Sequence, residues 1–211
     1  GNIRQQILTL AVPLLLGNIL QQLYNTADSL IVGRFLGTNA FDSVGISGSL
    51  MNHFIFILDG FCAGITVILG QFYGSGDRKK YREEVFTALL LGMIIALIIS
   101  GVCTVFLDPI LNLIHTPDEL IPYAESYLFI ILAGLPFTCL YNLLSGILRS
   151  IGNTRVALSF LAAAITVNIA LDFLFIGILR LGTGGAAAAT ILSQFFSAIC
   201  CFLYLRDTYP G

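Results

Sequence analysis

Three aspartates, Asp28, Asp59 and Asp172, lie inside long apolar segments of a chain that is 57% hydrophobic and only 10% charged. An ionised carboxylate in the hydrocarbon of a membrane is costly unless it is paired, protonated or in contact with water. Carboxylates in such segments therefore mark proton relays, ion sites or substrate sites by default. The depth of each aspartate in the membrane indicates which of them act together.

The mean hydropathy of +0.92 excludes an ordinary soluble domain. Apolar runs of about 20 residues predict helices that cross a bilayer, and short connections with Gly, Pro and Asn separate six such runs. The predicted fold is an all-α membrane protein, a six-transmembrane-helix bundle that forms a single domain over residues 1–211. We predict the spans at residues 7–32, 43–72, 85–107, 120–147, 156–179 and 185–205.

The distribution of Lys and Arg predicts the orientation of this bundle. With six spans both termini lie on one side, and eight of the ten basic residues fall there. They are Arg4, Arg78, Lys79, Lys80, Arg82, Arg149, Arg155 and Arg206. The other side holds only Arg34 and Arg180. By the positive-inside rule, we expect a multi-pass protein of the cell (plasma) membrane with both ends of this segment cytoplasmic.

This topology assigns depths to the polar side chains. Asp28 precedes the outer Arg34 by six residues, and Asp172 precedes the outer Arg180 by eight. At 1.5 Å per residue both carboxylates lie about 9–12 Å below the outer boundary. Thr190, six residues into the sixth span, reaches the same level. Three helices are thus predicted to place polar groups in one layer.

Two further residues share these helix faces at a spacing of four: Tyr24 precedes Asp28, and Asn168 precedes Asp172. Oxygen ligands of this kind suit a proton or a hard cation such as Na⁺. Structural readings remain open, since Tyr24 can be a core tyrosine and Asn168 can join helices. Thr190 can bond to its own backbone.

Asp59 lies near the middle of the second span, away from this layer. It can snorkel, bond to a neighbouring helix or line a cavity. Pro13 lies in the first span, about four turns from Asp28, and is expected to bend that helix. Such a bend can move Asp28, although packing alone can also account for it.

No catalytic signature occurs, neither a paired-His motif nor a nucleophile elbow nor a metal-binding cluster, so an enzyme is not expected. No basic patch alternates with aromatic residues, and no nucleic-acid partner is expected. The five cysteines lack metal-ligand or redox spacing and are interpreted as small hydrophobic residues. We expect no cofactor other than H⁺ or Na⁺ as a coupling ion.

Five segments resemble the multidrug and toxic compound extrusion (MATE) transporters, in the order that this family shows, and the resemblance extends over the whole chain. They are PLLLGNILQQLYNTADSLIVGRFLG, GQFYGSGDRKK, ILRSIGNTR, VNIALD and GAAAATILSQ. The resemblance implies one lobe of a twelve-helix transporter, the N-terminal MATE lobe. A C-terminal lobe of the same protein would then be its partner, within the lipid bilayer.

The resemblance also implies roles for individual residues. The ion site of similar members maps onto Asp28, Asn168, Asp172 and Thr190, which would couple H⁺ or bind Na⁺. The substrate cavity maps onto Tyr24 and Asn142, although the residue count places Asn142 nearer the inner side. The helix bend maps onto Pro13. The family pattern implies no role for Asp59.

The predicted function is secondary active multidrug efflux, in which organic cations leave the cell against inward H⁺ or Na⁺. Two close carboxylates in a low dielectric do not both stay ionised cheaply. Their neutralisation would remove the field that holds a cationic substrate, and the lobe would rearrange. The alternatives are a lipid-linked oligosaccharide flippase of the same superfamily, disfavoured because no Lys or Arg lies deep in a span, and a non-transporting membrane scaffold.

Overall fold

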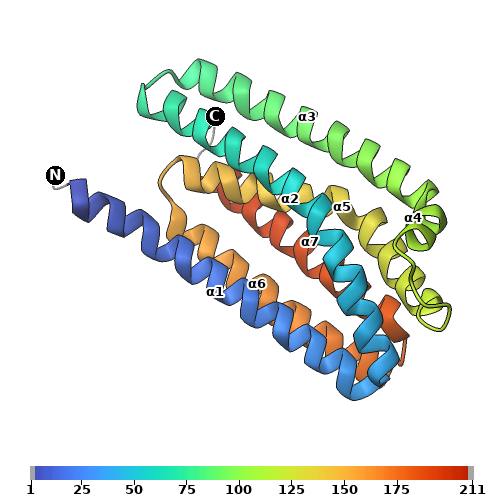
Figure 1. Cartoon of the computed structure of the whole chain (residues 1–211). Helices are drawn as coiled ribbons and strands as arrows, with labels where there is room; N and C mark the ends of the chain where they lie inside the picture. Colours follow the sequence, from blue (N-terminus) through green and yellow to red (C-terminus); the bar gives the residue numbers. More distant parts are fainter. Residues whose placement is uncertain (1–2, 209–211) are drawn as a thin grey trace.

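The computed structural model describes the backbone of residues 3–208 and, within it, all side chains except those of residues 3–11, 13, 14, 18, 50, 52 and 53. Helices form nearly all of this part of the chain, and no strand occurs in it (Figure 1). The elements are α1 (Ile3–Leu36), α2 (Thr38–Gly74), α3 (Arg78–Val105), α4 (Leu107–Leu113), α5 (Ile121–Ser150), α6 (Thr154–Asp172), the π-helical segment η1 (Phe173–Ile178) and α7 (Gly182–Thr208).

Among the described residues, five segments are long and apolar enough to cross a membrane: Phe54–Gly74, Arg78–Val105, Ile121–Ser150, Thr154–Ile178 and Gly182–Thr208. They lie where the second to sixth spans are predicted. The 34-residue α1 lies where the first is predicted. It is long enough for a hydrocarbon core of about 30 Å at 1.5 Å per residue. Many side chains in its first half fall outside the description, so its crossing stays a prediction.

Helix α5 lies at the centre of the bundle, where it packs against α2, α3 and α7 (Figure 1). Small residues permit this close approach. A Cβ atom on Gly134 would collide with Ile191 of α7, and one on Gly146 would collide with Thr66 of α2. Pro136 lies inside α5, which continues past it to Ser150.

Helix α1 runs beside α6 along one side of the bundle, and it also contacts α7 (Figure 1). A single residue, Gly37, separates α1 from α2, and its φ of +87° is a conformation that favours glycine. Next to α1, α6 changes from α-helical to π-helical directly after Asp172. The Leu179 N–H bonds to the Leu174 carbonyl at 2.8 Å, five residues back. Neither this change nor the short helix α4 is predicted from the sequence.

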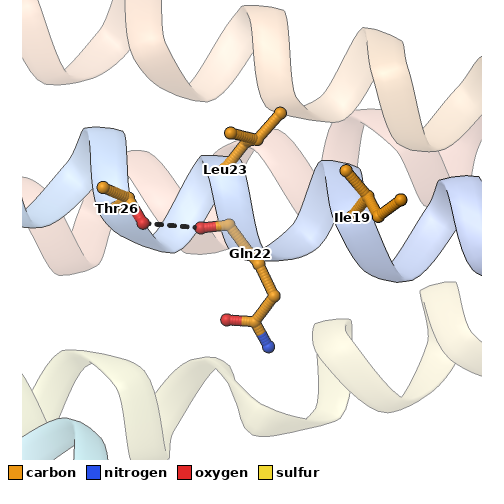
Figure 2. Close-up of a pocket in the computed structure, with 4 residues that line it drawn as sticks. All are labelled: Ile19, Gln22, Leu23 and Thr26. Carbon is orange, nitrogen blue, oxygen red and sulfur yellow. Dashed lines mark hydrogen bonds between the residues drawn. The ribbon is translucent and has the colours of Figure 1, made fainter.

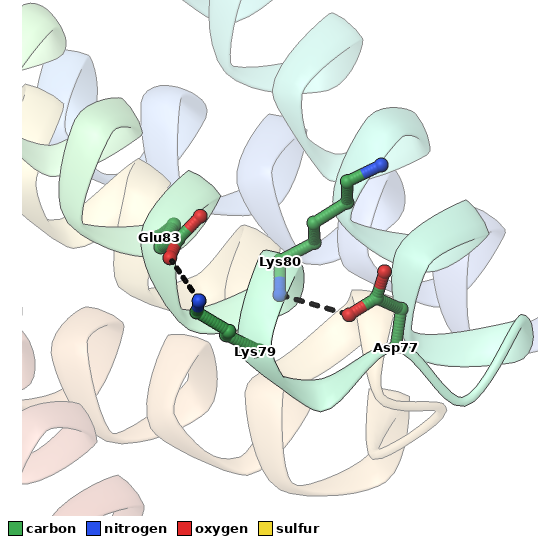
Figure 3. Close-up of polar contacts among 4 residues, drawn as sticks. All are labelled: Asp77, Lys79, Lys80 and Glu83. Atoms are coloured by element: carbon green, nitrogen blue, oxygen red, sulfur yellow. Dashed lines mark hydrogen bonds and ion pairs between the residues drawn. The ribbon is translucent and has the colours of Figure 1, made fainter.

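The beginning of α1, the α2–α3 turn and the end of α7 lie at the same end of the bundle (Figure 1). Figure 3 shows the start of α3 there, where the Asp77 side chain caps the helix by accepting the Lys80 N–H at 3.1 Å. Lys79 and Glu83 form an exposed ion pair of 4.0 Å. Such exposed pairs add little stability. That this basic end is cytoplasmic remains a prediction.

Candidate functional site

The centre of the site is a pair of carboxyl groups from two helices. Asp28 on α1 and Asp172 at the end of α6 lie within hydrogen-bond reach of each other. Both are buried, with exposed fractions of 7% and 0%. The contact between α1 and α6 brings them together although they are 144 positions apart in the sequence. Carboxylates so close in a low dielectric repel strongly unless a proton or a cation lies between them.

Asn168 joins this pair to α7. Its amide fits its surroundings when Nδ2 donates to Asp172 Oδ2 at 3.0 Å and its oxygen accepts the Thr190 backbone N–H at 3.0 Å. In the opposite orientation Nδ2 lies 3.4 Å from Thr190 Oγ1, while the amide oxygen faces only acceptors. We assign the first orientation because it satisfies both groups. Asn168 therefore fixes one oxygen of Asp172.

Tyr24 completes the connection from α1 to α7, because its hydroxyl lies 3.0 Å from Thr190 Oγ1. Thr190 also donates to the Ala186 carbonyl at 3.1 Å, which is the backbone bond expected of a helical threonine. A hydroxyl has one proton to donate, so Tyr24 is the donor to Thr190. The Thr190 hydroxyl therefore bonds to its own helix backbone and also contacts the Tyr24 hydroxyl in the cluster.

The remaining carboxyl oxygens define what the site can bind. Within the described residues, Asp28 Oδ1 and Asp172 Oδ1 are buried and have no hydrogen-bond partner. No Lys or Arg in this part of the chain forms an ion pair with either aspartate. Buried polar atoms without a donor are rare and call for an explanation. Two acceptors so placed fit a shared proton or a small hard cation.

Tyr127 on α5 also lies beside this cluster, although it was not predicted from the sequence. Its phenol interacts electrostatically with both Asp28 and Asp172. It lies six residues after Ile121, where α5 begins, and Thr190 lies eight after Gly182, where α7 begins. A count of depth along the fourth span would have placed Tyr127 in the same layer.

A different face of α1 borders an open hollow of about 300 Å³ lined by Ile19, Gln22, Leu23 and Thr26. Figure 2 shows the Gln22 amide extending away from α1 toward the pale yellow ribbon of α5. Thr26 Oγ1 donates to the Gln22 carbonyl at 2.9 Å. Tyr24, predicted to line a substrate cavity, is not among the lining residues, since it turns toward Thr190.

The structure places the other two predicted residues away from this cluster. Asn142 of α5 donates from Nδ2 to Asp59 Oδ1 of α2 at 2.8 Å. Of the three alternatives considered for Asp59, the structure shows the bond to a neighbouring helix. Pro13 lies within α1, but its side chain is outside the described ones, and the hinge stays a prediction. The predicted coupling residues Asp28, Asn168, Asp172 and Thr190 lie together with Tyr24, but their role is not thereby established.

Known proteins are similar to this chain in sequence and in fold. A profile of the MatE family matches residues 13–174. The chain is 36% identical over 197 residues to the probable multidrug resistance protein YpnP of Bacillus subtilis, covering 92% of this chain and 44% of YpnP. It is 29% identical over 191 residues to the FAD transporter of Shewanella oneidensis, covering 89% of this chain and 42% of that protein.

The structure of an outward-facing multidrug resistance MATE family transporter of the MOP superfamily superposes with a TM-score of 0.92 at 26% identity. The superposition covers 100% of this chain and 47% of that one. The chain thus spans about half the length of the relatives it matches. Its helices and its ordered motifs both agree with the sequence-based prediction of one lobe. The chain belongs to the MATE family of multi-pass membrane transport proteins.

Proposed function

We propose that this chain is the ion-coupled lobe of a secondary transporter that moves organic cations out of the cell against inward H⁺ or Na⁺. The observation that supports this proposal is the buried Asp28–Asp172 pair with one orphaned oxygen on each residue. A structural pair would have its acceptors satisfied by donors. A pair that must bind and release a cation needs acceptors that the protein leaves without donors.

The energetics of such a pair fit ion coupling. Two unit charges 4 Å apart at an effective dielectric constant of 20 repel by about 4 kcal/mol. A proton that enters down a gradient of one pH unit supplies about 1.4 kcal/mol. The repulsion that is relieved when one of the two ionised carboxylates is neutralised is therefore larger than the free energy that the gradient supplies per proton. Uptake of H⁺ or Na⁺ can then change which arrangement of the lobe is favoured.

The elements that hold the pair are suited to transmit this change. Asp28 is on α1, whereas Asp172, Asn168 and Thr190 are on α6 and α7, so ion binding changes the attraction between α1 and its neighbours. The π-helical segment after Asp172 is a geometry often found at functional sites. A bend at Pro13 would allow α1 to respond without unfolding. Alternating access would follow from two such arrangements.

An organic cation is the substrate class that fits the charges of the chain. In the described part, the Lys and Arg residues lie near the ends of the long helices and not in their middle, whereas three carboxylates lie within them. The Shewanella oneidensis relative is named for FAD, an anionic molecule, which would need cationic groups deep in the lobe. The rest of the cavity would come from a second lobe, which completes the length of the relatives.

Transport by the complete protein in proteoliposomes tests the proposal. We expect a fluorescent cation such as ethidium to be moved when a pH or Na⁺ gradient is imposed, and the effective gradient to identify the coupling ion. Movement that responds to neither gradient would contradict ion coupling. Replacement of Asp172 by Asn should abolish the response, and Asp108→Asn, which changes an exposed carboxylate on α4, should preserve it.

A further inference from the structure

Asp59 is a carboxylate that the coupling pair does not use. It is the only charged residue between Phe54 and Gly74, the apolar segment of α2 that is long enough to cross a membrane. Its side chain is exposed, as are those of the preceding Phe56 and Ile57. A carboxylate exposed to lipid at this depth would be highly unfavourable. The face that carries Asp59 must therefore meet water, a cation or another part of the protein.

Asp59 lies at a different depth from the coupling pair. Counted at 1.5 Å per residue from Gly37, Asp28 lies about 14 Å along α1 and Asp59 about 33 Å along α2. The two carboxylates are thus separated by about 20 Å along the bundle. Asp59 cannot share a proton or a cation with Asp28, and it needs an explanation of its own.

The surroundings of Asp59 form a polar stripe along α5. Thr138, Asn142, Ser145 and Arg149 follow each other at spacings of four, three and four residues, which places them on one face of the helix. From this face, Asn142 Nδ2 donates to Asp59 Oδ1 at 2.8 Å. The bond fixes the direction of the carboxylate and leaves Oδ2 available.

Arg149 is a positive charge on the same face of α5, and it forms no ion pair with Asp59. Its Nε donates to the Ser145 carbonyl at 3.3 Å, which keeps the side chain along α5. The two groups interact electrostatically, yet no ion pair joins them among the described residues. A carboxylate that is oriented by an amide, near a membrane centre and without a direct counter-charge, is suited to bind a cation.

We infer that Asp59, oriented by Asn142, binds the cationic group of the transported molecule, an ammonium or comparable monovalent organic cation. This inference rests on the proposed function and adds a substrate position to it. Because Asp59 lies about 20 Å from the coupling pair along the helices, the bound cation is not displaced directly by the coupling ion. The two sites communicate through rearrangement of the helices.

Equilibrium binding tests the inference without any gradient. We would measure binding of radiolabelled tetraphenylphosphonium to the complete protein, purified in detergent. Asp59→Asn should weaken binding about tenfold or more, since a charge-assisted contact becomes a neutral one. Asn142→Ala should weaken it less, because the carboxylate remains but is no longer held. Asp42→Asn, at an exposed carboxylate of the same helix, is the matched control and should bind as the unmodified protein does.

The direction in which a third variant changes the affinity distinguishes a cation-binding role of Asp59 from a structural one. Arg149→Gln removes a positive charge that repels the bound cation, so it should strengthen cation binding by roughly threefold. In the Asp59→Asn background the same change should have little effect, because the cation is no longer held where Arg149 can repel it. A merely structural Asp59 would give neither the opposite sign nor this dependence.

The outcomes distinguish this inference from the proposed function. Asp28→Asn should lose gradient-driven transport and keep tetraphenylphosphonium binding, whereas Asp59→Asn should lose binding itself. Unchanged affinity in Asp59→Asn, with the protein eluting as a single species, would overturn the inference and leave the coupling proposal standing. Absence of binding by the unmodified protein would overturn the organic-cation substrate and this inference together.

Discussion

Asp28→Asn is the change that addresses the coupling site most directly. Asparagine has nearly the same size as aspartate, and its amide can donate to Asp172, with which Asp28 is within hydrogen-bond reach. The buried position of residue 28, 7% exposed, is thereby retained. The substitution removes only the ability of this residue to carry a charge and to bind or release a proton.

The expected magnitude follows from the repulsion within the pair. The doubly ionised pair is unfavourable by about 4 kcal/mol at 4 Å and an effective dielectric constant of 20. A free-energy difference of this size corresponds to about a thousandfold change in an equilibrium constant. In Asp28→Asn the doubly charged state no longer exists, so an ion gradient loses this means of shifting the lobe between arrangements. Accumulation of the cation should fall to the level set by passive exchange.

The assay compares two modes of transport in the same proteoliposomes. Gradient-driven ethidium accumulation should be lost in Asp28→Asn, while exchange of ethidium across vesicles without a gradient should continue. Asp108→Asn should retain both modes, because its carboxylate is exposed on α4. If Asp28→Asn accumulated ethidium against its gradient as well as the unmodified protein, the assignment of Asp28 to coupling would be refuted.

Three further predictions concern local contacts. Tyr24→Phe removes the 3.0 Å hydrogen bond to Thr190. It should reduce the rate of gradient-driven transport about two- to tenfold, in line with about 0.5–1.5 kcal/mol; an unchanged initial rate would contradict this. Gly134→Leu places a side chain where Ile191 lies, and thermal denaturation in detergent should show a loss of roughly 1–3 kcal/mol. Asp77→Ala removes the cap of α3 and should cost about 1 kcal/mol in the same assay, while transport stays unchanged.

Counting residues from charged helix ends anticipated which polar side chains lie together. Arg34 and Arg180 mark helix ends, and the constant rise per residue then gives similar predicted depths for Asp28 and Asp172. The structure indeed places both carboxylates, Asn168 and Thr190 in one cluster. The hydrogen-bond partners of these side chains could not be predicted, because the depth of a residue does not determine which helices are adjacent.

Other features had no local signal. The π-helical turn after Asp172 occurs within an ordinary apolar run, FLFIGI, whose composition fits an α-helix equally well. The bond between Asn142 and Asp59 joins residues 83 positions apart. It depends on the crossing of α2 and α5, which small residues such as Gly146 allow. A helix in the connection at Leu107–Leu113 was likewise not predicted, since it is only seven residues long.

The sequence by itself determined the class of the molecule, because long apolar segments have one stable form in lipid, and backbone polar groups there must be satisfied within helices. It also singled out the three aspartates, since the cost of burying a charge does not depend on the details of packing. Counting along the helices also set Asp59 apart from Asp28 and Asp172. Only the tertiary structure decided which groups each carboxylate contacts, because that depends on which helices touch, α1 with α6 and α2 with α5, and close packing of many weakly specific contacts decides this.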